Sequence, residues 1–250
     1  MSLQTMRRIA AVTFDLWDTL IQERPKGSDK VAELRISRIA SVLEAKGLAH
    51  TRDEIASAYE KTGSFLQLTW SKRKDMSIRD QLLFMLSCID DKLPGKLNPA
   101  EFTAIEKAYV DSILDHPPHL LPNAKEALSA VRARGYRVGL ISNTGRTPGS
   151  TLRVLMDRLG ILNQFDATTF SNEILVRKPS EGMFKATLEK LRVVPKAAVH
   201  VGDDAASDVG GAKGVGMYAI QVVTDGTIRS SLADLHVRSL STVADAIDEL

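Results

Sequence analysis

Cysteine is nearly absent from this sequence, which has only Cys88 among its 250 residues. A single thiol excludes an internal disulfide and a zinc site made of several cysteines, and it fits a reducing compartment. Long apolar runs are also missing. No stretch approaches the roughly 20 apolar residues of a membrane span, and the start of the chain has no apolar signal core. We therefore expect a cytoplasmic protein that does not span a membrane.

The chain carries little excess charge of either sign. Its 33 Lys and Arg residues nearly balance its 31 Asp and Glu residues, so the formal net charge is +2. A nearly neutral chain offers no long-range field to a polyanion or to an anionic membrane, so we expect neither nucleic acid nor a membrane surface as a partner. A length of 250 residues fits either one large α/β domain or a domain with a smaller insert.

Residues 21–118 have the pattern of an all-α segment. Apolar residues recur there at the three- and four-residue spacing of amphipathic helices, as in Ile36, Ile39 and Leu43. Pro117-Pro118 ends the last helix, because a proline nitrogen cannot donate and the residue before a proline avoids helical dihedral angles. Capping boxes mark helix starts at two sites, Thr51 with Glu54 and Asn98 with Glu101.

Beyond this segment, short apolar runs alternate with helical patterns, which is typical of a parallel sheet covered by helices on both faces. The apolar run 10–14 must join that sheet, because a lone strand attached to a helical bundle has no pairing partner. We therefore expect an α/β core of residues 1–20 and 119–250, with residues 21–118 inserted. The later elements expected are helices over 124–134, 150–159, 182–191, 209–214 and 241–250, and strands over 136–141, 167–170, 198–201 and 218–223.

Four short motifs lie at the ends of predicted strands. They are Phe14-Asp15-Leu16-Trp17-Asp18, Leu140-Ile141-Ser142-Asn143, Arg177-Lys178-Pro179, and Gly202-Asp203 continuing to Asp208. In this order they resemble the haloacid dehalogenase (HAD) superfamily of phosphatases and dehalogenases, and the resemblance spans the whole chain. It implies a doubly wound, Rossmann-like parallel sheet with a helical C1-type cap inserted between the first two motifs. It also implies that the first and fourth core strands are adjacent, which puts Asp15 beside Asp203 at the topological switch point.

The side chains of these motifs suit phosphoryl transfer. Asp15 is a carboxylate that can attack phosphorus and form an acyl phosphate, which divides a difficult hydrolysis into two steps. Ser142 can donate a hydrogen bond to a phosphate oxygen beside the backbone amide of Asn143, and Lys178 supplies a positive charge. We predict Asp15, Ser142 and Lys178 as catalytic residues. Ser142, Asn143 and Lys178 are also the predicted phosphate ligands for a small phosphorylated substrate.

Asp203 and Asp208 add hard oxygen ligands to Asp15. Together with the backbone carbonyl of Trp17, these carboxylates suit octahedral Mg²⁺, with the remaining positions left to water and phosphate. Without a cation, three carboxylates would repel a phosphate dianion. We therefore predict Mg²⁺ as the cofactor, bound by Asp15, Trp17, Asp203 and Asp208.

Three residues of this region have expected structural roles. Asp208 is expected to cap the helix 209–214 in addition to binding metal. Asp204 is expected to be a solvated turn residue. His200 lies on an apolar strand, so it is expected to be a packed core residue and not a ligand.

Trp17 departs from the pattern that the resemblance implies. Phosphatases of this superfamily place a second Asp there, two residues after the nucleophile, as a general acid and then a base. An indole cannot transfer a proton near neutral pH, so that role is unfilled. General acid–base catalysis contributes about 10² to 10⁴ in rate, so alkyl phosphates should react slowly unless another group, such as Asp18, substitutes. A substrate with a good leaving group, such as an acyl or aryl phosphate, removes that requirement.

Two other functions stay open. Dehalogenases of this superfamily also have an aromatic residue at the position of Trp17, and in that chemistry Asp15 attacks the carbon of a 2-haloacid without a metal. That reaction leaves Asp203 and Asp208 unexplained, which favours a Mg²⁺-dependent phosphatase with an aspartyl-phosphate intermediate. The third possibility is a catalytically weak protein that uses this fold for binding or regulation.

The sequence says less about the substrate. Arg146 lies four residues after Ser142 in a polar loop, and we include it among the predicted substrate-binding residues, with a solvated position as the alternative. Phe65 and Trp70 either face the cleft or pack as ordinary core aromatics. Proline placement predicts hinges for cap closure near residues 20–25 and 117–122. The oligomeric state stays open between a monomer and a homodimer.

Overall fold

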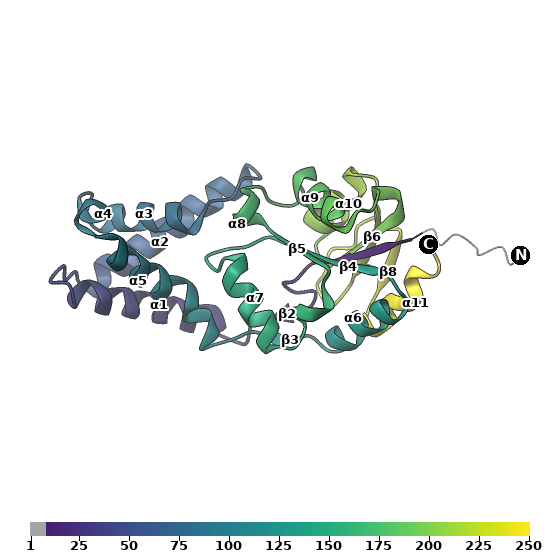
Figure 1. Ribbon diagram of the computed structural model, residues 1–250, viewed down its shortest axis with the longest axis horizontal. Helices are drawn as coiled ribbons and strands as arrows, with labels where there is room; N and C mark the ends of the chain where they lie inside the picture. The colour runs from purple at the N-terminus through teal and green to yellow at the C-terminus, as the bar shows by residue number, and fades with distance from the viewer. Residues whose placement is uncertain (1–8) are drawn as a thin grey trace, which may run out of the picture.

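The structure is a computed structural model that describes residues 9–250, so the part of the expected core before residue 9 lies outside the described residues. Its centre is a six-stranded sheet with the order β5-β4-β1-β6-β7-β8, and all the pairings within it are parallel. A lobe of helices extends from one end of this sheet (Figure 1). The strands of the sheet are β1 (Ala11–Phe14), β4 (Arg137–Ser142), β5 (Ala167–Phe170), β6 (Ala198–Gly202), β7 (Tyr218–Val222) and β8 (Leu235–Val237).

The position of β1 makes the sheet doubly wound. Phe14 pairs with Leu140 of β4 on one side and with Val201 of β6 on the other. The chain thus builds the sheet outward to β5 and then returns to add β6 beside β1. This order confirms the predicted α/β class and the adjacency of the first and fourth core strands, and it leaves a switch point at the carboxyl end of β1.

Helices pack against both faces of the sheet, and each face has its own apolar core. Two such clusters of buried residues form, one that includes Leu128, Leu152 and Val243, and another that includes Phe184 and Ala212. These residues belong to the helices α6 (Ala124–Ala133), α7 (Gly149–Arg158) and α11 (Val243–Ile247) in the first cluster, and α9 (Glu181–Leu191) and α10 (Gly211–Gly214) in the second.

The helical lobe has a third apolar core of its own. Ile39, Leu82, Met85 and Tyr109 are completely buried in it. Both predicted capping boxes are present at the starts of α2 and α5. The helices of the lobe are α1 (Gly27–Glu44), α2 (Arg52–Ser71), α3 (Ile78–Ile89), α4 (Leu93–Lys96) and α5 (Pro99–Val110), followed by a 3₁₀ turn (Asp111–Leu114).

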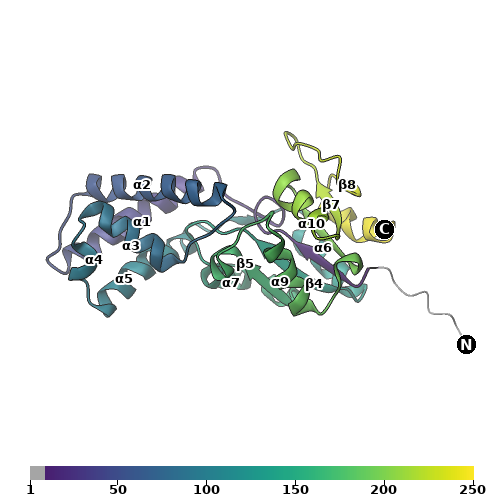
Figure 2. The ribbon, with the colours of Figure 1, turned by 90° about the horizontal axis from the view of Figure 1, so that it is seen from above.

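Two neighbouring chain segments connect this lobe to the sheet. The strands β2 (Ile21–Gln22) and β3 (His119–Leu120) pair antiparallel, and the amide of Leu121 donates to the carbonyl of Leu20 at 2.9 Å. The chain therefore leaves and re-enters the core at one place. Viewed from above, the lobe continues the long axis of the molecule away from the C-terminus (Figure 2). Within residues 9–250, no helix is both long enough and apolar enough to cross a membrane.

Several elements differ from the sequence-based prediction. The expected helix over 209–214 is a π-helical turn (Ala205–Gly210) followed by the short α10. Asp204 caps this turn in place of Asp208, because its Oδ1 accepts from the amides of Ala206 and Ser207. The prediction that Asp208 is the cap is therefore wrong.

Short elements account for the remaining differences. The helix expected over 241–250 is a 3₁₀ turn (Leu240–Thr242) and a five-residue α11. The sequence patterns do not predict β8, whose three residues are too few to show an alternation. They also do not predict α8 (Ser171–Ile174) or the 3₁₀ turns Leu162–Gln164 and Pro195–Ala197.

Candidate active site

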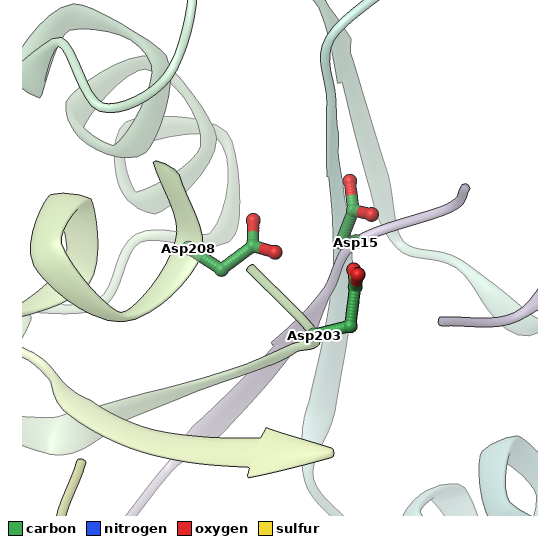
Figure 3. Close-up of side chains that lie close together, drawn as sticks. All are labelled: Asp15, Asp203 and Asp208. Carbon is green, nitrogen blue, oxygen red and sulfur yellow. The ribbon is translucent and has the colours of Figure 1, made fainter. Parts of the chain in front are cut away.

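Three carboxylates meet at the carboxyl ends of β1 and β6 (Figure 3). Asp15 directly follows β1, Asp203 directly follows β6, and Asp208 lies in the π-helical turn. The parallel register places Phe14 opposite Val201, so both strands end at the same edge of the sheet. One carboxylate oxygen of each residue lies within 4.8 Å of the others. The structure therefore brings together the three acidic side chains that the sequence predicts as metal ligands.

Asp208 reaches this point by folding back over the end of β6. A Cβ atom at position 202 would lie 2.4 Å from Cγ of Asp208, so the close approach requires Gly202. The carboxylate accepts a hydrogen bond from the amide of Asp204 at 3.0 Å. His200 is buried as expected, and its Nε2 also lies 3.3 Å from Asp208 Oδ1, a contact that the sequence does not predict.

Lys178 links two of the three carboxylates. Its Nζ donates to Asp15 Oδ1 at 2.5 Å and to Asp208 Oδ1 at 2.6 Å, and the side chain is almost completely buried. Asn143 fixes the backbone of Lys178, since its Oδ1 accepts from the Lys178 amide at 2.8 Å. Ser142, the last residue of β4, is buried beside it. Asp15 and Lys178 lie in loops and Ser142 ends β4, so the three predicted catalytic residues lie at one edge of the sheet.

Burial controls the charge of the acidic cluster. It raises the pKa of Asp15 to about 8, although Lys178 acts in the opposite direction. Burial, assisted by the charge of Asp208, raises the pKa of Asp203 to about 6. Burial also opposes ionisation of Asp208, but Lys178 and His200 outweigh it and hold the pKa of this carboxyl far below its usual range. The cluster therefore has more carboxylates than its single ammonium group can neutralise.

This donor set fits a hard divalent cation. Three carboxylates supply only oxygen, which is the ligand type that Mg²⁺ prefers, and their side chains converge on one region. A bound dication would also favour the ionised form of Asp15, whose pKa burial has raised. Trp17 follows two residues later in the same loop, where its backbone carbonyl stays a predicted fourth protein ligand.

Comparison with protein families agrees with the resemblance seen in the sequence motifs. Residues 9–216 match the family of haloacid dehalogenase-like hydrolases. The chain belongs to this family. A relative from Xenopus laevis, "Haloacid dehalogenase-like hydrolase domain-containing protein 3", is 28% identical over 90% of this chain and 90% of its own length. The "Glyceraldehyde 3-phosphate phosphatase" of Pyrococcus furiosus is 27% identical over 86% of this chain and 81% of its own length.

Solved structures of HAD-like hydrolases share the fold. A HAD phosphatase from Thermococcus onnurineus aligns with a TM-score of 0.63 and 24% identity, covering 96% of this chain and 98% of its own. A 2-haloacid dehalogenase from Pseudomonas syringae aligns with a TM-score of 0.69 and 20% identity, covering 96% and 99%. Phosphatases and dehalogenases therefore share this architecture, and the chemistry has to be argued from the site.

In this hydrolase, a buried ion pair joins the helical lobe to the loops of the cluster. Asp75 lies between α2 and α3, and its completely buried carboxylate contacts Nη1 of Arg177 at 2.9 Å. Asp75 Oδ2 also accepts hydrogen bonds from the hydroxyl groups of Thr144 and Ser171. Thr144 follows Ser142 by two residues, and Arg177 directly precedes Lys178. Asp75 therefore holds the two loops that carry predicted catalytic residues.

The backbone and an aromatic ring reinforce this contact. Lys74 and Val176 form an antiparallel bridge between the lobe and the core. The guanidinium of Arg177 lies 4.3 Å from the ring centroid of Trp70, whose Nε1 donates to Asp75 Oδ1 at 3.1 Å. The sequence does not predict this arrangement, because the two charges of the ion pair are 102 residues apart. A lone acid after the basic run 72–74 is the only signal.

We expect Asp75→Asn to destabilise the hydrolase by about 2 to 3 kcal/mol, because Arg177 stays largely buried without its carboxylate partner. Urea unfolding followed by circular dichroism measures this change. Glu60→Gln on the exposed surface of α2 is the matched control and should change the free energy of unfolding by less than about 0.5 kcal/mol. Equal stability of the two variants would show that the ion pair does not hold the lobe.

Arg146 lies at the junction of the lobe and the core and not in solvent. Its guanidinium stacks 3.6 Å from the ring centroid of Tyr59 on α2, and its Nη2 donates to the Tyr59 carbonyl at 2.9 Å. Arg146, Trp17 and Trp70 line a cavity of about 300 Å³. Phe65 stacks on Phe84 of α3, with 4.3 Å between the ring centroids.

Proposed function

We propose that this hydrolase is a Mg²⁺-dependent phosphatase that acts on a small phosphorylated metabolite in the cytoplasm. The observation that carries the proposal is the convergence of Asp203 and Asp208 on Asp15. Attack on carbon with loss of halide needs only the carboxylate of Asp15. Three converging carboxylates are instead suited to bind a divalent cation, which in turn attracts a phosphate dianion. The name of the Pyrococcus furiosus relative, a phosphatase, points the same way.

In the proposed reaction, a carboxylate oxygen of Asp15 forms a bond to phosphorus and the leaving oxygen departs with its electron pair. Water then attacks phosphorus as the bond between phosphorus and the Asp15 oxygen breaks, the proton of the water passes to solvent, and inorganic phosphate and the Asp15 carboxylate are released. Ser142 and the amide of Asn143 donate to the phosphate oxygens, and Lys178 neutralises part of the developing charge. Asp15, Asp203, Asp208 and the Trp17 carbonyl hold Mg²⁺, which supplies charge neutralisation at the phosphate.

Trp17 sets the expected leaving group. It is half-buried and lines the cavity, so at this position the loop presents an indole in place of a proton donor. Asp18 is exposed and has a positive φ of 56°. We therefore propose substrates whose leaving group departs without a proton, such as acyl or aryl phosphates.

The helical lobe serves as a cap in this proposal. Residues 21–118 form the cap and the remaining residues the core, with the paired strands β2 and β3 at the joint between them. Closure of the cap excludes water from the cluster and brings the residues of the lobe to the substrate. The expected hinges are the segments 20–25 and 117–122 that flank this strand pair.

A panel of phosphate esters and 2-haloacids, with and without Mg²⁺, tests the proposal. We expect phosphate release that requires Mg²⁺ and is faster with aryl than with alkyl esters by about 10² or more, in line with the missing general acid. Equal rates for alkyl and aryl esters would overturn the leaving-group proposal. Release of halide from 2-haloacids without metal would identify a dehalogenase, and no turnover of either class would favour a binding protein.

The charge of the cluster predicts that metal binding releases a proton. Because the pKa of Asp15 is about 8 without metal, its carboxyl is mostly protonated at pH 7. Binding of Mg²⁺ should therefore release about one proton at pH 7, and the affinity should rise with pH until it levels off above pH 8. Calorimetric titration in buffers of different ionisation enthalpy measures the released protons. A pH-independent affinity between pH 6 and pH 8 would contradict the burial of Asp15 described here.

A further inference from the structure

Among residues 9–250, two arginines at the junction of the cap and the core have no acidic partner. Arg35 on α1 is buried, and Arg146 lies half-buried in the loop after β4. Within residues 9–250, neither guanidinium forms an ion pair with a carboxylate, although most other buried or half-buried charges of the chain do. Burying a positive charge without a counterion is unfavourable, so two such charges side by side indicate that an anion completes the site.

Arg35 makes only neutral contacts. Its Nε donates to the carbonyl of Tyr109 at 2.8 Å, its Nη1 to the hydroxyl of Tyr59 at 3.2 Å, and its Nη2 to the hydroxyl of Thr147 at 2.8 Å. Tyr59 and Thr147 are both neighbours of Arg146, one by stacking and one in sequence. Arg35 therefore acts as a positioning residue that fixes the two groups around Arg146.

Arg146 has one free donor. Its Nη1 is buried and has no hydrogen-bond partner among the described residues, whereas its Nη2 is bound to the Tyr59 carbonyl. Gly63 leaves the space for this arrangement, because a Cβ atom there would lie 2.5 Å from Nη2 of Arg146. The ring and carbonyl of Tyr59 and the close approach of Gly63 thus hold the guanidinium of Arg146 in place. Its Nη1 is left without a hydrogen-bond partner among the described residues.

The cavity beside these arginines is lined in part by Trp17, two residues after Asp15, and by Gly145, three residues after Ser142. It measures about 300 Å³, and its lining includes Arg35, Arg146, Trp17 and Trp70. Four residues of extended chain span at most about 14 Å, so Arg146 is within that distance of Ser142 along the backbone. The other charged residues of the lining are the exposed Glu23 and Arg24, so three arginines face one glutamate and the lining has excess positive charge.

We propose that the substrate carries a second anionic group, a carboxylate or a phosphate, and that Arg146 binds it while the first phosphate lies at Asp15. The inference rests on the proposed phosphatase function and adds the class of substrate: a small, doubly acidic phosphate ester. The aromatic rings of Trp17, Tyr59 and Trp70 contact the part of the molecule between its two acidic ends. The backbone between Ser142 and Arg146 spans at most about 14 Å, so the two acidic ends belong to one small molecule.

A matched set of aryl phosphates tests the proposal. Phenyl phosphates with a para carboxylate, a para phosphonate or a para carboxamide have nearly the same shape but differ in the charge of the distal group. We expect kcat/KM for at least one of the two anionic esters to exceed that for the neutral ester at least about tenfold, and the better of the two identifies the group. No preference for either anion over the carboxamide would overturn the proposal.

Variants assign the preference to Arg146. Arg146→Gln should reduce the preference to about twofold or less, and Arg146→Lys should keep part of it. Gly63→Ala tests the same contact without removing the charge, because the added methyl group displaces the guanidinium and should also weaken the preference. Arg52→Gln is the control on the exposed surface of α2, where Arg52 pairs with Glu33, and it should keep the preference of the unmodified protein. An undiminished preference in both Arg146→Gln and Gly63→Ala would overturn the assignment.

A binding measurement separates this inference from the proposed function. Both tryptophans of the chain, Trp17 and Trp70, line the cavity, so intrinsic fluorescence reports directly on its occupation. Benzoate should change this fluorescence at concentrations where benzamide does not, and Arg146→Gln should abolish the difference. If the protein binds benzoate in this way but releases no phosphate from any ester, the anion site is supported and the phosphatase proposal is overturned. Equal effects of benzoate and benzamide would overturn the anion site.

Discussion

Asp15→Asn is expected to reduce the rate of phosphate release by at least about 10⁴, a loss of about 5 kcal/mol of transition-state stabilisation. An amide oxygen of Asn cannot attack phosphorus as a carboxylate does, so the first step of the proposed reaction fails. Folding should survive, because ionised Asp15 is itself costly in the buried cluster, as its pKa of about 8 shows. Steady-state assays with a generic aryl phosphate and saturating Mg²⁺ measure the loss.

Asp157→Asn is the matched control for this substitution. Asp157 is exposed on α7, and its replacement should leave the rate within about twofold of the unmodified protein. Phosphate release by Asp15→Asn at more than about a tenth of the original rate would mean that Asp15 is not the nucleophile. The two remaining carboxylates would then act as ligands for a metal that activates water directly.

Removal of the buried ammonium group should have the largest effect on stability. We expect Lys178→Met to lower the free energy of unfolding by about 3 to 5 kcal/mol at pH 8 without metal, because Asp15 and Asp208 lose the charge that both contact. The loss should be smaller at pH 5. Without Lys178 the pKa values of both carboxyls rise in the folded protein, so they are protonated at low pH and become costly only as the pH rises.

Urea unfolding at the two pH values measures the effect of Lys178→Met. Lys185→Met removes an exposed lysine that pairs with Glu181 four residues earlier, and it should cost no more than about 0.5 kcal/mol at either pH. Mg²⁺ should restore part of the stability of Lys178→Met, since a dication replaces the missing positive charge. Equal costs at pH 5 and pH 8 would show that the carboxylates are not the groups that Lys178 stabilises.

The sequence predicts the fold and the acidic cluster because both depend on local signals. Apolar runs that end at a polar residue mark β1, β4 and β6, and the rules for parallel sheets bring the ends of those strands to one edge. The places of Asp15 and Asp203 at strand ends follow from these rules, whereas the prediction that their strands are adjacent comes from the resemblance to the HAD superfamily. The helical lobe follows from periodicity and from two capping boxes, which the structure contains.

Long-range contacts explain what the sequence does not predict. Asp75 and Arg177 come from different parts of the chain, and no spacing rule links an acid after α2 to an arginine in front of Lys178. His200 has the pattern of a core residue, yet burial brings its ring to Asp208. Asp204 caps the π-helical turn in place of Asp208. A π-helical turn contains about one more residue than an α-helical turn, and Asp208 faces the acidic cluster from it.

The position of Arg146 also depends on tertiary contacts that its local sequence does not indicate. In sequence it is an ordinary polar loop residue, for which solvent exposure is the usual outcome. In the structure Tyr59 and Gly63 of α2 hold it against the helical lobe, and no carboxylate of residues 9–250 forms an ion pair with it. The proposed anion site therefore depends on the contact between two segments that are far apart in sequence.

Direct observation of the covalent intermediate tests the central claim of this account. The protein is mixed with an aryl phosphate and Mg²⁺, quenched in acid within the first turnover, digested and mapped by mass spectrometry. We expect one phosphoryl group on the peptide that contains Asp15, absent when Mg²⁺ is omitted and absent in Asp15→Asn. A phosphoryl group on another residue, or rapid turnover with no labelled peptide, would contradict it.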